Sequence, residues 1–528
     1  MRTIATVLAA VTLFGCSITS PPSDDGDPED SIAVDDGKAD DFFSASALEY
    51  TVTGKASVTF TSQPTQAEVE KLISEKQIGI AWFLTQYLVD KEDDDANKDF
   101  GGFGGMAKGG MWKDLDVQTT DNLTYTFTFK QLVAGGKTML SKLPIKTVGG
   151  QQVFDLEIGK PTNDQLGQLT INEEWYRQPP FDAWDPSKVP ADQKETVRLA
   201  IARETASTDA FFDMAKLTAD GTLDIDVFFG WDYHDNFHIK HSKDYFTWLV
   251  NQGFKAPVAD WDHLNKDSAA FTKKMIANGK TITVEVRMYF GKPGAVTDPD
   301  TDAGGKVLES IARESLTKRD VVLYSGHSGP FYGFALANWN KTDEGDLDDS
   351  EMRTIPLASK YQVVLAEACD TYQIGEAFLE NPAKAGKNVD VITTTSFSNA
   401  ATPATVEDFT TALLAHDSLN RLRPQTELSL LTKLDSNAYE AGFHTMYGLH
   451  GIDNDPKLHP FANTAAFGTT CSANADCGGP GNLCVKMGSL GKRCTAACTA
   501  DVACPTDYRC KSVASSATST IYGKACAK

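Results

Sequence analysis

The chain has 528 residues, of which 23% are charged, and a formal net charge of −23 at pH 7. This length is too great for one ordinary hydrophobic core and predicts roughly two to four domains. The acidic balance argues against nucleic acids and anionic membrane surfaces as partners, because both bind basic patches.

The first residues, MRTIATVLAAVTLFGCSITS, carry one basic residue and then an apolar run of signal-peptide length. We therefore predict a removable export signal over residues 1–16. The tetrapeptide Leu13–Cys16 resembles a bacterial lipobox, which implies lipidation of Cys16. The protein is expected to be exported and lipid-anchored to the bacterial cell envelope, at the outer membrane, with secretion as the alternative. The membrane would be contacted only through the lipid.

Two regions precede the middle of the chain. Residues 17–44 contain the run PPSDDGDPEDSIAVDDGKADD, which is too polar to form a core and predicts a disordered acidic spacer. Residues 45–205 include period-two patterns at Tyr50–Phe60 and Leu123–Phe129, together with one helical stretch at Ala67–Asp90. Such alternation is typical of strands with one wet face, so we predict a β-rich α+β N-terminal domain.

Residues 206–435 have a different pattern, in which apolar β-rich runs alternate with helical segments. The runs are Asp224–Gly230, Thr281–Gly291, Val321–Gly326, Tyr361–Ala368 and Val389–Ser396, and the helices are Ser242–Gln252, Gly305–Thr317 and Thr371–Glu380. This alternation predicts an α/β domain with a mostly parallel sheet and helices on both faces. In such sheets, the loops at the carboxyl ends of the strands build the active site.

Eight of the ten cysteines are crowded near the C-terminus, after an extension over residues 436–470. They fall into two similar groups of four, namely Cys471, Cys477, Cys484 and Cys494, then Cys498, Cys504, Cys510 and Cys526. We predict a duplicated disulfide-rich module over residues 471–528 rather than a zinc site, because no CxxC pair occurs. Eight cysteines allow 105 pairings, so the connectivity stays open. Cys369 is left without a partner, and is either buried and inert or kept for chemistry.

His327 and Cys369 each follow directly after the apolar run of a predicted strand, in VVLYSGH and YQVVLAEAC. Their separation, 369 − 327 = 42 residues, is close to the roughly fifty that separate the histidine and cysteine of caspases and suits a crossover between neighbouring strands. An imidazole can accept the proton of a thiol nucleophile, and backbone amides at the turn can stabilise an oxyanion.

These motifs resemble the caspase-like cysteine peptidases, which include caspases, metacaspases, legumains and gingipains. Tyr324–His327, YSGH, is similar to the histidine motif of metacaspases, and Glu367–Cys369, EAC, to the cysteine motif of legumains. The resemblance covers about Leu223 to Leu422. It implies a caspase-like fold and a cysteine endopeptidase, with His327 as the base or the leaving-group acid, Cys369 as nucleophile and the amides of Ser328 and Cys369 as the oxyanion hole. Ser328 departs from the glycine usual after this histidine.

The resemblance also implies a substrate pocket containing Glu367 and, from the segment EDFTTALLAHDS, Asp408. The arginine that legumains add to this pocket has no counterpart after the first strand, where Lys240 is the candidate replacement. Two carboxylates without an arginine favour cleavage of a protein or peptide after a basic residue over cleavage after Asn.

Other interpretations of the same residues remain. GHSGP, residues 326–330, approaches the elbow of serine hydrolases with Ser328 as nucleophile, although Pro330 replaces its last glycine. A catalytically inactive caspase-like surface binding protein is a further alternative. Three histidines near Asp232 suggest a metal site but are read as a polar loop: His234, His238 and His241. No cofactor is required. Calcium is a candidate at two partial calcium-loop patterns, Asp298–Glu309 and Asn340–Glu351, both read as solvated acidic loops.

Overall fold

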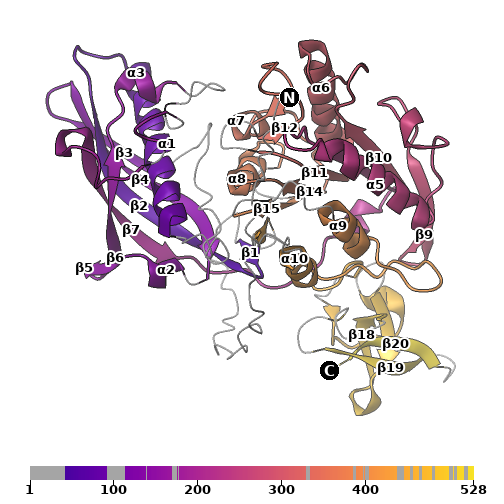
Figure 1. Cartoon of the computed structure of the whole chain (residues 1–528). Coiled ribbons are helices and arrows are strands. Elements are labelled where there is room, and N and C mark those ends of the chain that lie inside the picture. The colour runs from indigo at the N-terminus through magenta and orange to yellow at the C-terminus, as the bar shows by residue number, and fades with distance from the viewer. Residues whose placement is uncertain are drawn as a thin grey trace, which may run out of the picture.

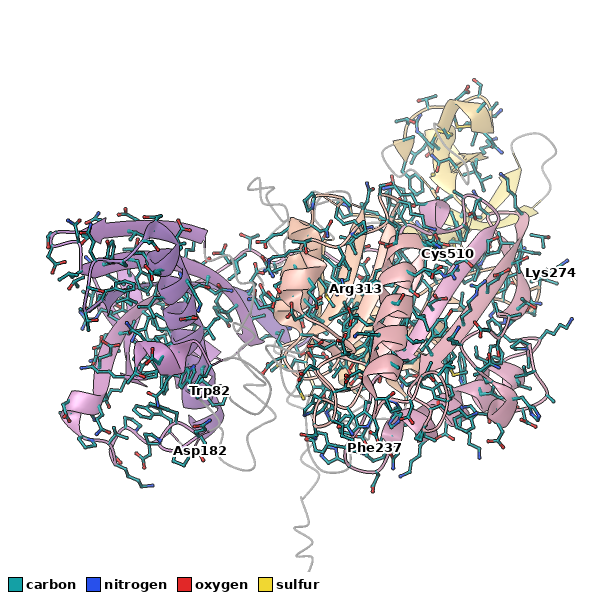
Figure 2. All side chains as sticks on the ribbon, turned by 90° about the horizontal axis from the view of Figure 1, so that it is seen from above. Trp82, Asp182, Phe237, Lys274, Arg313 and Cys510 are labelled. Carbon is teal, nitrogen blue, oxygen red and sulfur yellow. A yellow bond between two sulfur atoms is a disulfide. The ribbon has the colours of Figure 1, made fainter. Side chains whose placement is uncertain are left out.

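The computed structural model describes residues 42–91 and 113–527, with gaps at 138, 169–174, 176–177, 183, 329–332, 385–387, 396–397, 399–403, 437–444, 452–455, 463–465, 478–481, 499–503, 505–507 and 516–520. The predicted signal with Cys16 and most of the predicted spacer lie outside these ranges. Among the described helices, none is long and apolar enough to cross a membrane. Three units are visible along the chain (Figures 1 and 2).

The N-terminal unit is a six-stranded antiparallel sheet with one long helix on it (Figure 1). The strand order is β3-β4-β2-β7-β6-β5, from β2 (Ala47–Thr59), β3 (Lys113–Thr119), β4 (Thr124–Gly136), β5 (Lys146–Val148), β6 (Gln151–Gly159) and β7 (Lys194–Arg203). Helix α1 (Gln66–Lys91) buries residues such as Ile73 and Phe83 among Phe154, Trp175 and Leu199. Two short helices, α2 (Met139–Lys142) and α3 (Asn163–Leu166), complete the unit. The predicted β-rich α+β arrangement is confirmed.

The central unit is built on an eight-stranded mixed sheet of order β1-β16-β15-β14-β11-β8-β10-β9. The five predicted runs form its parallel part: β8 (Thr222–Phe229), β10 (Lys280–Phe290), β11 (Val321–Ser325), β14 (Gln362–Glu367) and β15 (Val389–Thr394). Three further strands add antiparallel pairs at the two edges: β1 (Phe43–Ser44), β9 (Phe271–Ala277) and β16 (Tyr447–His450). The sheet is therefore mostly parallel and mixed at its margins.

Helices cover both faces of this sheet, so its strands are buried on both sides. Val227, Leu323 and Leu365 face one core, against α5 (Phe237–Asn251), α9 (Thr405–Leu413) and α10 (Glu427–Asp435). Val322 and Val364 face the other core, against α6 (Asp302–Lys318), α7 (Asp349–Met352) and α8 (Tyr372–Glu380). The short helix α4 (Met214–Leu217) precedes β8, and the short strand β12 (Phe334–Ala335) pairs with β13 (Asp346–Leu347) outside the large sheet. The α/β layering predicted for this part of the chain is confirmed.

Two predicted boundaries are wrong. Strand β16 belongs to the central sheet although it lies in the predicted extension 436–470, so the domain does not end at 435. Strand β1 lies in the predicted spacer 17–44 and pairs with β16, and Phe42 beside it is 2% exposed. Both strands are too short to carry a readable hydrophobic period, and their positions depend on pairing with distant residues.

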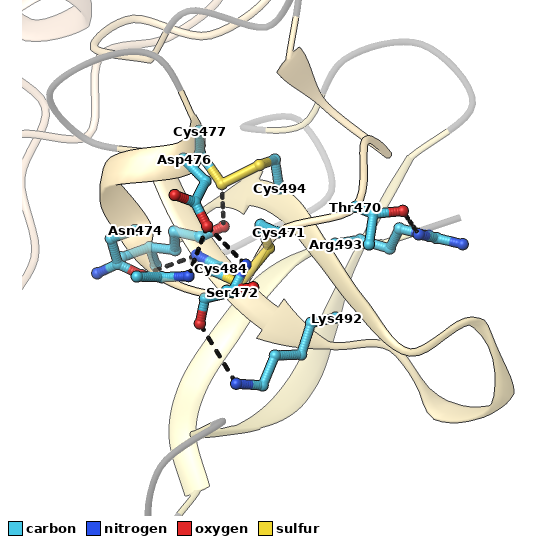
Figure 3. The surroundings of a disulfide bond; sticks show 12 residues. Thr470, Cys471, Ser472, Asn474, Asp476, Cys477, Cys484, Lys492, Arg493 and Cys494 are labelled. Carbon is cyan, nitrogen blue, oxygen red and sulfur yellow. Dashed lines mark hydrogen bonds between the residues drawn. A yellow bond between two sulfur atoms is a disulfide. The ribbon is translucent and has the colours of Figure 1, made fainter.

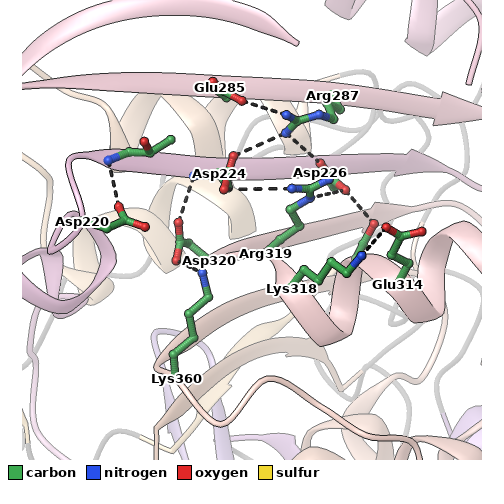
Figure 4. Close-up of polar contacts among 12 residues, drawn as sticks. Asp220, Asp224, Asp226, Glu285, Arg287, Glu314, Lys318, Arg319, Asp320 and Lys360 are labelled. Carbon is green, nitrogen blue, oxygen red and sulfur yellow. Dashed lines mark hydrogen bonds and ion pairs between the residues drawn. The ribbon is translucent and has the colours of Figure 1, made fainter. Parts of the chain in front are cut away.

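A buried ion network lies between β8, β10 and the end of α6 (Figure 4). The side chain of Asp226 on β8 is 1% exposed, and its Oδ2 accepts hydrogen bonds from Ser315 Oγ at 2.6 Å and Arg319 Nε at 2.9 Å. Arg287 Nη1 lies 3.9 Å from the other oxygen of Asp226. A buried carboxylate needs such partners, because an unpaired charge in the core is strongly destabilising.

The C-terminal module is a four-stranded sheet held by four disulfides, of which Figure 3 shows Cys471–Cys484 and Cys477–Cys494. Its strands are β17 (Asn482–Lys486), β18 (Lys492–Ala496), β19 (Arg509–Ser515) and β20 (Ile521–Ala527). The bonded pairs are Cys471–Cys484, Cys477–Cys494, Cys498–Cys510 and Cys504–Cys526. In each half the first cysteine bonds the third and the second bonds the fourth, so the predicted duplication and disulfides are confirmed. A module of this kind is consistent with an exported protein.

Candidate active site

The candidate site lies at the carboxyl ends of three adjacent strands, β8, β11 and β14. From β8, the next parallel strand, β10, pairs on one side, whereas β11 and all later parallel strands lie on the other side. The gap between β8 and β11 is thus a topological switch point, where open α/β sheets bind ligands. Asp232, His327 and Cys369 follow these three strand ends in turn.

The strand register brings His327 and Cys369 to matching positions on neighbouring strands. Ser325 pairs with Glu367, an offset of 367 − 325 = 42 residues, which equals 369 − 327. The pairing continues one residue further, because the Gly326 N–H donates to the Glu367 carbonyl at 3.1 Å. Neighbouring strands in a sheet are about 4.8 Å apart. His327 and Cys369 therefore leave the sheet side by side, each two residues beyond a paired position.

The His327 ring is held from several sides. Its Nε2 lies 2.8 Å from Asp232 Oδ1, and its side chain is 12% exposed. The Tyr233 ring stacks on it with centroids 4.7 Å apart, and Trp339 contacts it edge-on at 5.7 Å. Burial lowers the pKa of His327 below its ordinary value, against the opposing effect of Asp232. The imidazole is therefore neutral at pH 7 and able to accept a proton.

Asp232 is fixed by the backbone of the loop between β8 and α5. Its Oδ2 accepts N–H groups from His234, Asp235 and Phe237, at 3.2, 3.0 and 3.1 Å. Burial alone would raise the pKa of Asp232, but the hydrogen bonds from His327, His234 and the backbone hold it below its ordinary value. A carboxylate at this position accepts the Nε2 proton of His327 and leaves Nδ1 free to accept another.

This role of Asp232 was missed by the sequence prediction, which considered the residue only as one member of a metal site beside three histidines. The available signal was its position, two residues after Gly230 at the end of a strand next to the one that precedes His327. Of those histidines, His238 and His241 lie on α5 and are buried, while His234 Nδ1 lies 3.0 Å from Asp232 Oδ1. The loop that was predicted ends at Phe237, where α5 begins.

Cys369 is a half-buried residue and is the free cysteine of the described residues. Its Sγ donates to the Ser398 carbonyl at 3.4 Å, and burial raises its pKa to about 12. The thiol is thus protonated at rest. The next residue, Asp370, has a left-handed backbone with φ of 51°, whereas Ser328 is not among the described residues with positive φ. Serine in place of glycine after His327 is therefore not held in the left-handed backbone conformation that favours glycine.

The two predicted pocket acids lie in different surroundings. The Glu367 carboxyl is buried, accepting hydrogen bonds from Ser325 Oγ at 2.6 Å and from the Ser398 hydroxyl, and burial raises its pKa to about 7. Asp408 lies on α9 with its carboxylate 3.6 Å from Lys433 Nζ. Burial and, more weakly, the charges of Glu367, Asp435 and Asp408 raise the pKa of Tyr447.

The acids of the calcium-loop patterns contact other groups of the protein. Asp300 accepts from Asn338 Nδ2 at 2.6 Å and from Lys341 Nζ at 2.5 Å, and Asp298 closes its own turn. Asp348 and Glu351 form the capping box of α7. These contacts use the carboxylates for local structure, and calcium at either loop stays a prediction.

The candidate oxyanion donors are the backbone amides of Ser328 and Cys369. Ser328 follows Gly326–His327, Cys369 follows Glu367–Ala368, and both lie at the same edge of the sheet. After Ser328 the next described element is the short strand β12. A serine elbow needs a helix at that point, so the structural context of a serine hydrolase nucleophile is not found in the described residues. Comparisons with protein-family models, curated proteins and solved structures found no match for this chain.

Proposed function

We propose that the central unit is a cysteine endopeptidase of caspase-like type. The observation that carries the proposal is the shared offset of 42 residues, by which β11 and β14 pair and by which His327 and Cys369 are separated. A base and a thiol on matching positions of adjacent strand ends can come within the hydrogen-bond reach that thiol catalysis requires. Asp232 adds the third group that orients the base.

In the proposed reaction, Cys369 attacks the carbonyl carbon of a peptide bond while its proton passes to His327 Nδ1. The carbonyl oxygen becomes an oxyanion, bound by the backbone amides of Ser328 and Cys369. His327 then donates its proton to the leaving amine, which departs and leaves a thioester on Cys369. Water, deprotonated by His327, hydrolyses the thioester and restores the thiol. Because the resting thiol has a raised pKa, deprotonation accompanies attack rather than preceding it.

Specificity for a basic residue over Asn is proposed from Glu367 and Asp408. Glu367 lies two residues before the nucleophile, and its carboxyl has a pKa of about 7, so it carries negative charge above neutral pH. A buried carboxylate with hydroxyl partners pairs well with a Lys or Arg side chain. The enzyme would act outside the cytoplasm, attached to the envelope through lipid on Cys16.

One observation favours a second candidate, a caspase-like binding protein without activity. Burial raises the pKa of the Cys369 thiol to about 12, and its hydrogen bond goes to the Ser398 carbonyl. Structural cysteines in buried surroundings are inert. The two candidates differ in whether His327 makes Cys369 react with a substrate-like electrophile.

The deciding experiment is labelling of the purified protein with peptidyl electrophiles that carry Lys, Arg, Asn or Asp next to the reactive group, alongside a fluorophosphonate. Mass spectrometry locates the modified residue. The proposal expects selective modification of Cys369 that is lost in His327→Ala. His263→Ala is the matched control, because His263 also bonds an aspartate, at 2.6 Å, but on the exposed η3 (Trp261–His263).

Modification of Ser328 by the fluorophosphonate would replace the proposal with a serine hydrolase. Absence of reaction with every probe, before and after limited proteolysis, would favour the inactive binding protein.

A further inference from the structure

Beside His327 the structure gathers a second imidazole around the same carboxylate. Asp232 Oδ1 lies 2.8 Å from His327 Nε2 and 3.0 Å from His234 Nδ1. One ligand atom from each of the three residues lies within 4.8 Å of the others. Two imidazoles and one carboxylate form a donor set that binds zinc, whereas calcium and magnesium prefer oxygen ligands.

We propose that Asp232, His234 and His327 bind Zn²⁺ reversibly and that the bound ion switches off the peptidase. The metal site stands on the geometry alone, and its effect on activity rests on the proposed function. Zn²⁺ would take the place of the protons in the two hydrogen bonds that His234 and His327 now make with Asp232.

The distances suit such a replacement. Zinc binds imidazole nitrogen and carboxylate oxygen at about 2.0–2.2 Å, which places two tetrahedral ligand atoms about 3.4 Å apart. The present separations of 2.8 and 3.0 Å from Asp232 Oδ1 need to open by about half an ångström, and all three ligand atoms already lie within 4.8 Å of one another. Asp232 is fixed by three backbone N–H groups, so it is a rigid central ligand. Three protein ligands leave a fourth position for water, as in zinc sites that keep an open position.

Zn²⁺ can reach the site from solvent at His234, because the side chain of His234 is 50% exposed. The Asp232 side chain behind it is 3% exposed. Tyr233 lies against both rings, with centroids 3.9 Å from His234 and 4.7 Å from His327. His234 is therefore the adjustable ligand at the solvent side, and His327 is the ligand that connects the ion to the thiol.

Inhibition follows from the chemistry of the imidazole ring. A neutral histidine that ligates through Nε2 carries its proton on Nδ1. When zinc takes the place of the Nε2 proton, that proton moves to Nδ1, and His327 no longer has a nitrogen to accept the proton of Cys369. Removal of zinc by a chelator returns a proton to Nε2 and frees Nδ1.

The test measures binding and inhibition separately on the full chain. Zn²⁺ affinity is measured by competition with a chromogenic chelator, and Co²⁺ serves as a spectroscopic substitute. His234→Ala is expected to weaken Zn²⁺ binding at least about a hundredfold, because it removes a ligand itself rather than a group that hydrogen-bonds to a ligand. His263→Ala, which alters a histidine–aspartate pair lacking a second imidazole, is expected to leave the affinity unchanged. Cys369→Ser is expected to keep the site and to give the same cobalt spectrum.

Inhibition is measured as the ratio of Cys369 labelling rates with and without Zn²⁺ in each variant, so a change in the basal rate cancels. In the wild type the labelling rate with Zn²⁺ is expected to be lower than the rate without it, so the ratio lies below one, and a chelator is expected to return it to one. In His234→Ala the ratio is expected to stay at one. Equal zinc affinity in wild type and His234→Ala would overturn the site. A near-ultraviolet sulfur-to-cobalt charge-transfer band, lost in Cys369→Ser, would make the thiol the ligand instead.

The two proposals fail in different ways. Zinc binding that depends on His234, with Cys369 unreactive to every probe, would keep the metal site and remove the peptidase. Labelling that depends on His327 but is unaffected by zinc at saturating binding would keep the peptidase and remove the switch.

Discussion

Asp232 Oδ1 lies 2.8 Å from His327 Nε2, although the two residues are 95 positions apart in the chain. The contact joins the ends of two adjacent parallel strands, β8 and β11. Because backbone N–H groups hold the other oxygen of Asp232, the carboxylate sets both the orientation of the ring and the nitrogen that carries its proton.

Replacing Asp232 by Asn tests this role of the carboxylate. The amide of Asn donates to Nε2, which moves the ring proton to Nδ1 and removes the base, as in the corresponding substitution of serine-protease triads. We expect the rate of Cys369 labelling to fall about a hundredfold. Asp235→Asn, in the same loop with an exposed side chain, is the control. Unchanged labelling in Asp232→Asn would show that the contact only supports the loop.

The raised pKa of Glu367 predicts a pH-dependent specificity. Its carboxyl is neutral below a pKa of about 7 and negative above it. The ratio of labelling by a Lys or Arg probe to labelling by the Asn probe is therefore expected to rise as the pH passes through about 7. Taking the ratio cancels the pH dependence of the thiol and the imidazole.

Glu367→Gln is expected to make this ratio flat across pH. The control is Asp435→Asn, because burial also raises the pKa of Asp435 to about 7 while its carboxylate accepts the N–H of Tyr447 on β16. If the ratio were independent of pH in Asp435→Asn but still changed with pH in Glu367→Gln, the titrating group would be Asp435. That result would contradict a role of Glu367 in the substrate pocket.

The ion network of Figure 4 predicts a large effect of Arg319 on stability. Arg319→Met leaves Asp226 buried with its charge poorly paired, which we expect to lower the free energy of unfolding by about 3–5 kcal/mol. Hydrogen exchange of the β8 and β11 amides measures this for the central unit alone. The double variant Asp226→Leu with Arg319→Met removes both charges and is expected to recover most of the loss. Equal exchange in wild type and Arg319→Met would mean that Arg287 alone satisfies Asp226.

Reduction of the disulfides is expected to unfold the C-terminal module and leave the candidate site working. Each native disulfide of a small domain contributes about 2–5 kcal/mol, and this module has a small apolar core. After reduction and desalting, proteolysis should accelerate between residues 471 and 527, while the labelling rate of Cys369 stays the same. Loss of labelling together with the module would show that the module supports the active site.

The parallel strands of the central sheet could be predicted because they are buried on both faces. Val321–Ser325 and Gln362–Glu367 have few polar residues, and such runs are visible in the sequence. His327 and Cys369 were chosen because they follow predicted strand ends, and in the structure those two strands, β11 and β14, are paired neighbours.

Asp232 and strand β16 could not be predicted in the same way. The contact between Asp232 and His327 depends on β8 and β11 being neighbours, and the residues around Asp232 mix aromatic side chains, polar side chains and histidines without a regular spacing. Strand β16 has four residues, and its place beside β15 depends on pairing across a long sequence separation. Local periodicity holds no information about either relationship.

The pairing of β1 with β16 has a consequence for proteolytic maturation. The chain first contributes Phe43–Ser44 to the central sheet, then forms the N-terminal unit, and returns to the central unit where Phe211 pairs with Lys457. Phe42 packs against Tyr372 and His450 on the central side. The N-terminal unit is thus inserted into the central one. A single cut before β2 would leave the unit covalently attached to the central unit, whereas a single cut after β7 would leave it joined only to β1, which pairs with β16. Removal of the unit as a propeptide with β1 kept in place would therefore need two cleavages and would leave β1 as a short bound peptide.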